Sequence, residues 1–242
     1  MKIALLGYGK LGKTIDALVL PTEHEVVLKV TSTNPLHIKD LKDVDVAIEV
    51  STPDMAETHI RMCLEAGVPI VVGTTGWYHQ LESIAALCKE REGALLHATN
   101  FSVGVNLFFM LNEWMAKQMH RLGGYEPSLL EIHHTEKKDA PSGTGISLAN
   151  DLIAEFPSKT KWVNRASAAP EELEIISQRL PDEPGTHVVT YISDVDSISL
   201  VHKAANRQGF ARGALQAAEW LMHRKGVFTM RDVLGLDEPA AV

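Results

Sequence analysis

Lys2-Ile-Ala-Leu-Leu-Gly7-Tyr-Gly9-Lys10-Leu11-Gly12 is an apolar run that ends in the spacing G-x-G-x-x-G, and a short helical pattern to about residue 19 follows it. The spacing is informative here because a strand precedes it and a helix follows it. The first glycine permits a tight turn, the second lets a pyrophosphate approach the backbone, and the third lets the helix pack on the strand. The stretch predicts a Rossmann domain that binds a dinucleotide.

The turn after the second strand, residues 25–30, bears on the choice of cofactor. A fold that prefers NAD normally offers an Asp or Glu to the ribose hydroxyls there, whereas this chain has Thr31-Ser32-Thr33-Asn34. The missing carboxylate removes repulsion of a 2′-phosphate, and Lys10 is a nearby cation in the glycine-rich turn. These residues favour NADPH, but hydroxyl groups can serve either cofactor, and NADH stays open.

Strands and helices continue to alternate through the first hundred residues. Apolar strands at residues 44–50, 69–72 and 95–98 are separated by helices at 54–66 and 79–90, which predicts a parallel sheet covered on both faces. Ligands of such sheets bind beyond the carboxyl ends of the strands. We therefore expect three strand ends to line the cofactor cleft, although turn chemistry is the simpler explanation of the first. They are Ser51, Gly73-Thr74-Thr75 and Thr99-Asn100-Phe101.

The pattern changes after residue 103. A long helix is predicted over residues 104–122, and the segments 173–180, 187–193 and 197–202 show the period of two that we interpret as antiparallel strands. Strands that follow one another without helices indicate a second, α+β domain with a mostly open sheet. One face of that sheet needs a cover, so we expect a homo-oligomer built on it.

The expected fold is α/β and has two domains. Residues 1–103 and 209–242 form the Rossmann dinucleotide-binding domain, which includes a helix at 210–224 and a tail at 227–236. Residues 104–208 form the substrate-binding and oligomerisation domain.

Reactive side chains gather in Glu131-Ile-His133-His134-Thr-Glu-Lys137-Lys138-Asp-Ala-Pro-Ser142-Gly143-Thr144. The pattern predicts a strand end, a turn and a helix over residues 144–156. A helix N-terminus offers free backbone N–H groups and the positive end of a dipole, which suits a carboxylate. A histidine, an ammonium group and this cradle predict a site that reduces or protonates a small anion. The alternative is a solvated charged loop that caps the helix.

The two adjacent histidines cannot share one role if the strand is regular, because neighbouring side chains point to opposite faces. Leu129, Glu131 and His133 form one row, and Leu130, Ile132 and His134 form the other. An imidazole is the side chain best matched to donating a proton near neutral pH.

Composition excludes several classes of protein. The net charge of −8 argues against non-specific binding of nucleic acid. Cys63 and Cys88 are not clustered, so we expect neither a disulfide framework nor a metal site. The sequence has no signal-peptide pattern and no apolar run of membrane-spanning length, so we expect no membrane partner and a cytoplasmic location.

Several further motifs follow the glycine-rich turn in order, and together they resemble the 4-hydroxy-tetrahydrodipicolinate reductase family of the diaminopimelate and lysine pathway. They are Gly73-Thr-Thr-Gly76, Ala98-Thr-Asn-Phe-Ser-Val-Gly-Val-Asn106, Glu131-Ile-His-His-x-x-Lys137, Asp139-Ala-Pro-Ser-Gly-Thr144, His202-Lys-Ala-Ala-Asn-Arg207 and Phe210-Ala-Arg-Gly-Ala-Leu215. The chain departs from the family at Gly145, where Ala is usual, in the missing acidic residue after the second strand, and in a short region around the first helix.

The resemblance implies a homotetramer that reduces a small dicarboxylate, 4-hydroxy-tetrahydrodipicolinate, to tetrahydrodipicolinate with NAD(P)H. His133 would protonate the carbon next to the one that receives hydride, and Lys137 would bind substrate and stabilise the transition state. The implied substrate ligands are His134, Ser142, Gly143, Thr144 and Thr75. The implied cofactor ligands are Gly7, Gly9, Lys10, Leu11, Gly12, Ser51, Gly73, Thr74, Thr75, Thr99, Asn100 and Phe101. Arg207 is open between a carboxylate ligand and a hinge salt bridge.

Two other functions compete with this one. Another nicotinamide-dependent dehydrogenase of amino-acid metabolism would explain the glycine-rich turn and a lysine, but not the complete run from His133 to Thr144. A dinucleotide-sensing protein without activity would tolerate loss of the proton donor and the cradle, and both are present.

Overall fold

The computed structural model describes residues 1–206 and 208–235, which form two compact units. The N-terminal unit comprises residues 1–103 and 208–235, and the inserted unit comprises residues 104–206. Arg207 and the end of the predicted tail lie outside the described residues. Every described helix is too short or too polar to span a bilayer.

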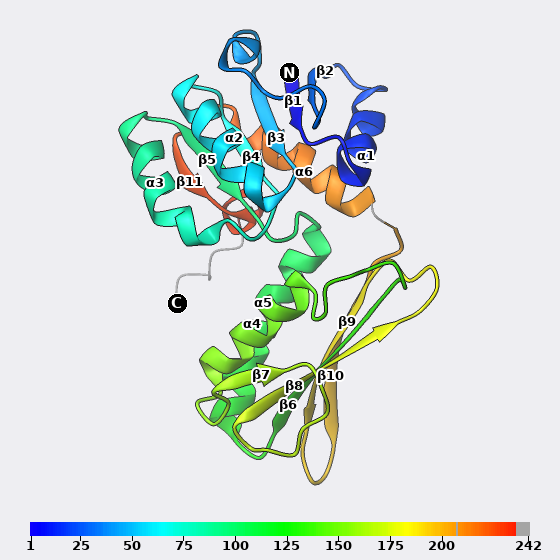
Figure 1. The fold of residues 1–242 in the computed structure, drawn as a ribbon. Helices are drawn as coiled ribbons and strands as arrows, with labels where there is room; N and C mark the ends of the chain where they lie inside the picture. The colour runs from blue at the N-terminus through cyan, green and yellow to red at the C-terminus, as the bar shows by residue number, and fades with distance from the viewer. Residues whose placement is uncertain (207, 236–242) are drawn as a thin grey trace. The chain divides into compact units, whose positions relative to one another are not determined.

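The N-terminal unit is built on one sheet of six parallel strands in the order β11-β5-β4-β3-β1-β2 (Figure 1). Its strands are β1 (Lys2–Leu6), β2 (Glu25–Val30), β3 (Val46–Glu49), β4 (Ile70–Val72), β5 (Ala94–His97) and β11 (Gly226–Phe228). Its helices are α1 (Lys10–Val19), η1 (Ile38–Leu41), α2 (Pro53–Glu65), η2 (Tyr78–Gln80), α3 (Leu81–Glu90), α6 (Gln208–Leu221) and α7 (Met230–Leu234).

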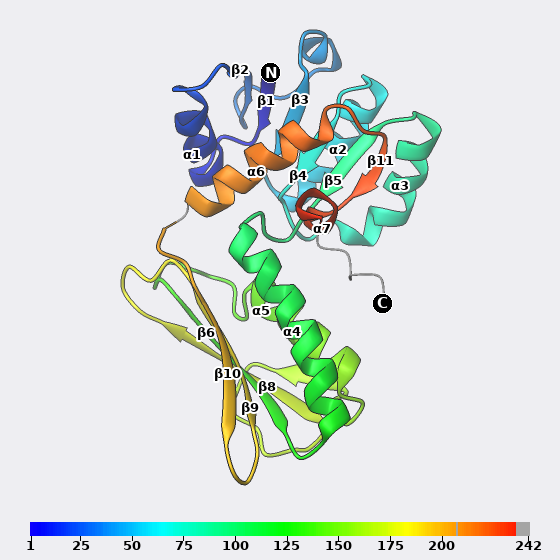
Figure 2. The same ribbon diagram turned by 180° about the vertical axis from the view of Figure 1, so that it is seen from behind.

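Two apolar cores cover the two faces of this sheet. One core joins the strands to α1 and α6 through small and branched side chains such as Ile15 and Ala214. The other joins them to α2 and α3 through Ile60 and Ile84. Figure 2 shows α6, in orange, lying across one face of the sheet. The predicted Rossmann architecture is confirmed, but β11, which pairs with β5, lies in the segment predicted as a tail.

The glycine-rich turn has the packing that its spacing predicts. Gly7 has a φ of 108°, and a Cβ there would lie 2.6 Å from the carbonyl oxygen of Val50. A Cβ on Gly12 would overlap the carbonyl oxygen of Gly7, so α1 approaches the end of β1 more closely than any side chain allows. Gly9 has open space beside its Cα, which leaves its backbone accessible to a ligand.

The inserted unit contains a mixed five-stranded sheet in the order β10-β9-β6-β8-β7. Its strands are β6 (Glu126–His133), β7 (Lys161–Val163), β8 (Glu172–Arg179), β9 (Thr186–Ile192) and β10 (Ser197–Lys203). The helices α4 (Val103–Leu122) and α5 (Gly143–Glu155) pack on one face, where Phe108 and Leu148 meet Leu129, Ile175 and Val189.

The prediction that residues 173–180 form an antiparallel strand is wrong. The strand β8 runs parallel to both β6 and β7, whereas β9 is antiparallel to β6 and β10. Alternation of side chains reports which residues share a face but not the direction of the neighbouring strand. The chain passes from β6 through α5 and β7 before it reaches β8, and such a crossover returns a strand in the parallel direction.

We predict that Gly213→Ala lowers the free energy of unfolding of the N-terminal unit by about 1–3 kcal/mol, the usual cost of overpacking. A Cβ on Gly213 would overlap the backbone carbonyl of Phe101, so α6 would have to move away from the sheet. Thermal and urea unfolding measure the effect. The control is Gly209→Ala in the same helix, where the nearest atom to a new Cβ is Ser102 Oγ at 3.6 Å. Equal unfolding curves for the two variants would contradict the packing argument.

Candidate active site

The register of the mixed sheet places four polar side chains in one row. Glu131 on β6 lies opposite Ser177 on β8 and opposite His187 on β9, and His202 on β10 lies opposite His187. Directly opposed residues point to the same face of a sheet. The row therefore lies on the face that α4 and α5 cover, and His133 lies two residues further along β6.

The predicted alternation at the end of β6 is confirmed. Leu129, Glu131 and His133 are buried, whereas Ile132 and His134 are only partly buried. The two histidines therefore face different surroundings, as the period of two requires.

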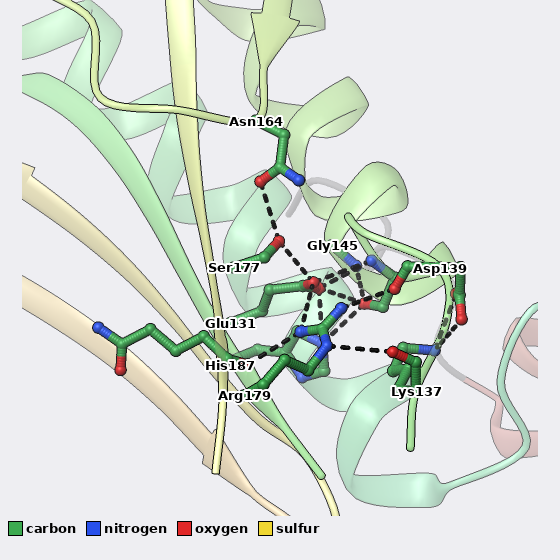
Figure 3. A network of polar contacts seen from close by, with 10 residues as sticks. Glu131, Lys137, Asp139, Gly145, Asn164, Ser177, Arg179 and His187 are labelled. Carbon is green, nitrogen blue, oxygen red and sulfur yellow. Dashed lines mark hydrogen bonds and ion pairs between the residues drawn. The ribbon is translucent and has the colours of Figure 1, made fainter. Parts of the chain in front are cut away.

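Glu131 is a fully buried carboxylate at the centre of a hydrogen-bond network (Figure 3). It accepts the backbone N–H of Ser142 at 3.0 Å, the Ser142 hydroxyl, and the Ser177 hydroxyl at 2.8 Å. The Arg179 guanidinium is 3.8 Å away. Burial acts to raise the pKa of Glu131, but the hydrogen bonds from Ser142 and Ser177 outweigh it and hold the pKa below its ordinary value. The side chain is a buried anion.

Ser142 begins the helix α5 as its N-cap. Its Oγ accepts the backbone N–H of Gly145 at 3.0 Å and lies 3.2 Å from Nε2 of His187. Both of its own donors, the N–H and the O–H, are directed at Glu131. The predicted role of Ser142 as a direct substrate ligand stays a prediction, because in this structure the residue supports α5 instead.

His133 is a buried imidazole whose Nδ1 has no hydrogen-bond partner. Its ring meets the ring of His187 edge-on, with 5.1 Å between the centroids, and Gly185 packs against its other nitrogen. Burial lowers the pKa of His133, Glu131 opposes that shift, and the Lys137 ammonium adds to it, so the pKa lies below its ordinary value. The ring gives up a proton more readily than a free imidazole.

His187 is held in its neutral form. It is 4 % exposed, and burial, with a smaller contribution from His133, lowers its pKa to about 3. Its Nδ1 also has no partner.

The loop after β6 is held by an arginine. The Arg179 guanidinium donates to the carbonyl oxygens of Asp139 at 2.7 Å and Lys137 at 3.3 Å. The Lys137 ammonium lies 2.8 Å from the Asp139 carboxylate, while Lys138 is exposed. Lys137, Lys138, Arg165 and Arg179 all line a cavity of about 340 Å³, so positive charge surrounds this loop.

A larger cavity, of about 690 Å³, lies in the N-terminal unit at the carboxyl ends of the strands. Of the predicted cofactor residues, Gly7, Gly9 and Ser51 line it. The other lining residues are Tyr8, Val30, Thr31, Ser32, Pro35, Val50, Thr52, Met55 and His59. Thr31 and Ser32 belong to the turn in which the sequence lacks an acidic residue.

The remaining predicted cofactor residues do not line this cavity. Lys10, Leu11 and Gly12 form the start of α1. Gly73, Thr74 and Thr75 follow β4, and Thr99, Asn100 and Phe101 follow β5. Phe101 is 2 % exposed and packs against Gly73, so its ring belongs to the core. Their contacts with a cofactor stay predictions.

Sequence reasoning missed a buried acid beneath the cavity. Glu49 ends β3 with no exposed surface, accepts the Ser51 backbone N–H at 3.1 Å and hydroxyl, and lies 3.3 Å from Nδ1 of His59. The signal was a single acidic residue in the apolar run of β3. A charge there must be paired or hydrogen-bonded.

Comparison with known proteins identifies the family. Residues 1–101 match the family model described as dihydrodipicolinate reductase, N-terminus, and residues 104–234 match the one described as dihydrodipicolinate reductase, C-terminus. The chain belongs to the dihydrodipicolinate reductase family.

Relatives extend over almost the full chain. A 4-hydroxy-tetrahydrodipicolinate reductase of Christiangramia forsetii is 43% identical, covering 97% of this chain and 98% of the relative. One of Methanocaldococcus jannaschii is 32% identical, covering 97% and 82%. The structure of a dipicolinate-bound dihydrodipicolinate reductase from Paenisporosarcina sp. TG-14 superposes with a TM-score of 0.76 at 24% identity, covering 95% and 97%. The predicted nicotinamide-dependent reductase of the diaminopimelate and lysine pathway is confirmed.

The row in the inserted unit also has the composition of a metal site. Potential ligand atoms of Glu131, His133 and His187 lie within 4.8 Å of one another. The Glu131 carboxylate, however, already accepts hydrogen bonds from two serines. We therefore interpret the trio as a hydrogen-bonded cluster of this reductase family.

We predict that His187 makes the stability of this reductase depend on pH. Its pKa is about 3 in the fold and near the ordinary 6.5 when unfolded. Its contribution is therefore complete above pH 6.5 and is lost as the pH falls from 6.5 towards 3, by at most about 1.4 kcal/mol per pH unit. Between pH 7.5 and 5, wild type should lose about 2 kcal/mol more unfolding free energy than His187→Gln. Urea unfolding at both pH values measures this.

The control for that prediction is His79→Gln, which changes an exposed histidine. It should lose stability in parallel with wild type. If His187→Gln also runs parallel to wild type, His187 is not neutral in the fold.

Proposed function

We propose that this reductase converts 4-hydroxy-tetrahydrodipicolinate to tetrahydrodipicolinate, with His133 as the general acid. The observation that carries the proposal is the buried His133 ring, whose Nδ1 has no partner and which lies beside cationic groups. NAD(P)H, when bound, supplies the hydride. His133 gives its proton to the neighbouring carbon, and the lowered pKa favours that transfer.

The negative charge of the substrate prepares His133 for this step. In the free protein the lowered pKa leaves the ring largely neutral near pH 7. A bound dicarboxylate close to the ring raises that pKa, since an opposite charge favours the protonated form. The proton is therefore gained together with the substrate.

The substrate cradle combines a cation with a helix N-terminus. Lys137 neutralises one carboxylate, and the first turn of α5, at Gly143 and Thr144, directs backbone N–H groups and the positive end of the helix dipole at an anion. Gly143 is exposed and has open space beside its Cα, so a ligand can approach the backbone. His134 and, from the N-terminal unit, Thr75 complete the proposed set.

The 690 Å³ cavity fits a dinucleotide. Its wall contains the accessible backbone of Gly9, and among the residues that line it there is no carboxylate to repel a 2′-phosphate. The cation of Lys29 lies 5.0 Å from the ring of Tyr8, which lines the cavity. We propose that NADPH is used at least as well as NADH. The homotetramer and the cytoplasmic location stay predictions.

The proposed function is tested with freshly made product of dihydrodipicolinate synthase. Oxidation of NADPH and NADH is followed separately by absorbance. No turnover with either cofactor would refute the proposal.

We predict that His133→Gln lowers kcat by about 10²–10⁴-fold, the usual worth of a general acid. Cofactor affinity, measured by fluorescence titration, should stay nearly unchanged, since the donor acts on the substrate. The companion variant His134→Gln should raise KM more than it lowers kcat. A loss below about tenfold in kcat for His133→Gln would assign the proton to another donor.

We predict that Lys137→Ala lowers kcat and raises the substrate KM, because it removes a charge from the substrate and from the transition state. The adjacent Lys138→Ala is the matched control: the side chain is exposed, and its loss should change either constant by less than about threefold. Steady-state kinetics decide between them. Greater damage from Lys138→Ala would shift the catalytic assignment by one residue.

We predict that Ser32→Asp raises the KM for NADPH by about tenfold and lowers that for NADH, since a carboxylate repels the 2′-phosphate and accepts from the ribose hydroxyls. Ser32 lines the cavity, whereas the adjacent Thr33 does not, so Thr33→Asp is the control. The wild-type KM for NADPH should also rise with salt more steeply than that for NADH. A wild type that strongly prefers NADH would contradict the prediction.

A further inference from the structure

We propose that Glu131 is a positioning residue whose buried charge fixes the substrate cradle and the surroundings of the proton donor. It touches neither substrate nor cofactor in the proposed mechanism. The inference rests on the proposed function only in naming what is positioned.

One carboxylate connects three segments of the inserted unit. Through Ser142 it holds the N-terminus of α5, and through Ser177, at 2.8 Å, it holds β8. Through Arg179, at 3.8 Å, it is linked to the loop that carries Lys137, because the same guanidinium donates to two carbonyl oxygens of that loop. Figure 3 shows Glu131 between Ser177, Arg179 and the start of α5. The proposed anion cradle is assembled around this one group.

The protons of the network follow from the charge of Glu131. A serine hydroxyl has one proton and two lone pairs. The Ser142 proton goes to Glu131, and one lone pair accepts the N–H of Gly145. The contact of 3.2 Å with His187 must then be a hydrogen bond that Nε2–H donates to the second lone pair. Glu131 thereby fixes the neutral tautomer of His187, with its proton on Nε2.

The tautomer matters because His187 lies against His133, with ring centroids 5.1 Å apart. The charged and titratable groups around His133 come from every neighbouring element: Glu131 on β6, His187 on β9, Arg179 on β8, and Lys137 and Asp139 in the loop. Glu131 is the nearest buried anion among these groups and opposes the cations that lower the affinity of His133 for a proton.

An amide cannot replace this carboxylate. Glu131 receives only donors, from Ser142 and Ser177, and a glutamine would direct an N–H₂ group at one of them. The space around it is also full, since a Cβ on Gly145 would lie 2.7 Å from Oε2. A change of charge is therefore not relieved by movement towards α5.

The test compares Glu131→Gln with Glu171→Gln, an exposed carboxylate in the same unit. Calorimetry measures binding of pyridine-2,6-dicarboxylate, and NMR follows the titration of the His133 ring. In Glu131→Gln, the dicarboxylate Kd and the substrate KM should rise by about tenfold or more, and His133 should titrate at lower pH than in wild type. Glu171→Gln should match wild type in all three.

A milder variant keeps the test decisive if Glu131→Gln does not fold. Ser177→Ala removes one donor and leaves the carboxylate in place. It should raise the dicarboxylate Kd in the same direction by about threefold. A folded Glu131→Gln or Ser177→Ala with wild-type dicarboxylate binding and unchanged His133 titration would overturn the inference.

Failure of the inference is distinguishable from failure of the proposed function. If wild type does not reduce the substrate but the dicarboxylate Kd and the His133 titration respond to Glu131→Gln, the function is wrong and the positioning role stands. If wild type is active and both readouts ignore Glu131→Gln, the function stands and the positioning role is wrong.

Discussion

A buried negative charge holds the proposed chemistry of the inserted unit in place. Removing a carboxylate from water is costly unless hydrogen bonds replace the lost hydration. Glu131 meets that condition with two serines, and each serine lies on a different element. The requirement works in both directions, because a charge that needs these donors also dictates where α5 and β8 lie.

The N-terminal unit repeats the device in a different setting. Glu49 ends a central strand of the parallel sheet, is fully buried, and meets Ser51 and His59 at the edge of the dinucleotide-sized cavity. In both units an acid at or near the carboxyl end of a strand lies beneath a site and orders a serine and a histidine. The two sites thus share a supporting principle although the sheets differ in topology.

The sequence predicted what depends on periodicity and on fixed spacing. The glycine-rich turn, the bounds of α1 and the opposite faces of His133 and His134 follow from local geometry, and the structure has them. It did not predict that β8 runs parallel to β6, nor that β11 joins β5, because strand direction and strand order are set by contacts between distant residues. The role of Ser142 as a support, and the hydrogen bonds of Glu131 and Glu49, depend on the same distant pairings.

The position of β11 has a consequence for the order of folding during synthesis. The core on one face of the N-terminal sheet includes Ala211, Ala214, Ala217 and Leu221, and β5 remains an edge until residues 226–228 pair with it. Those residues leave the ribosome last, whereas every strand of the inserted unit has been made by Lys203. The inserted unit can complete its sheet on the nascent chain while the unit that begins the sequence still waits for its last helix and strand.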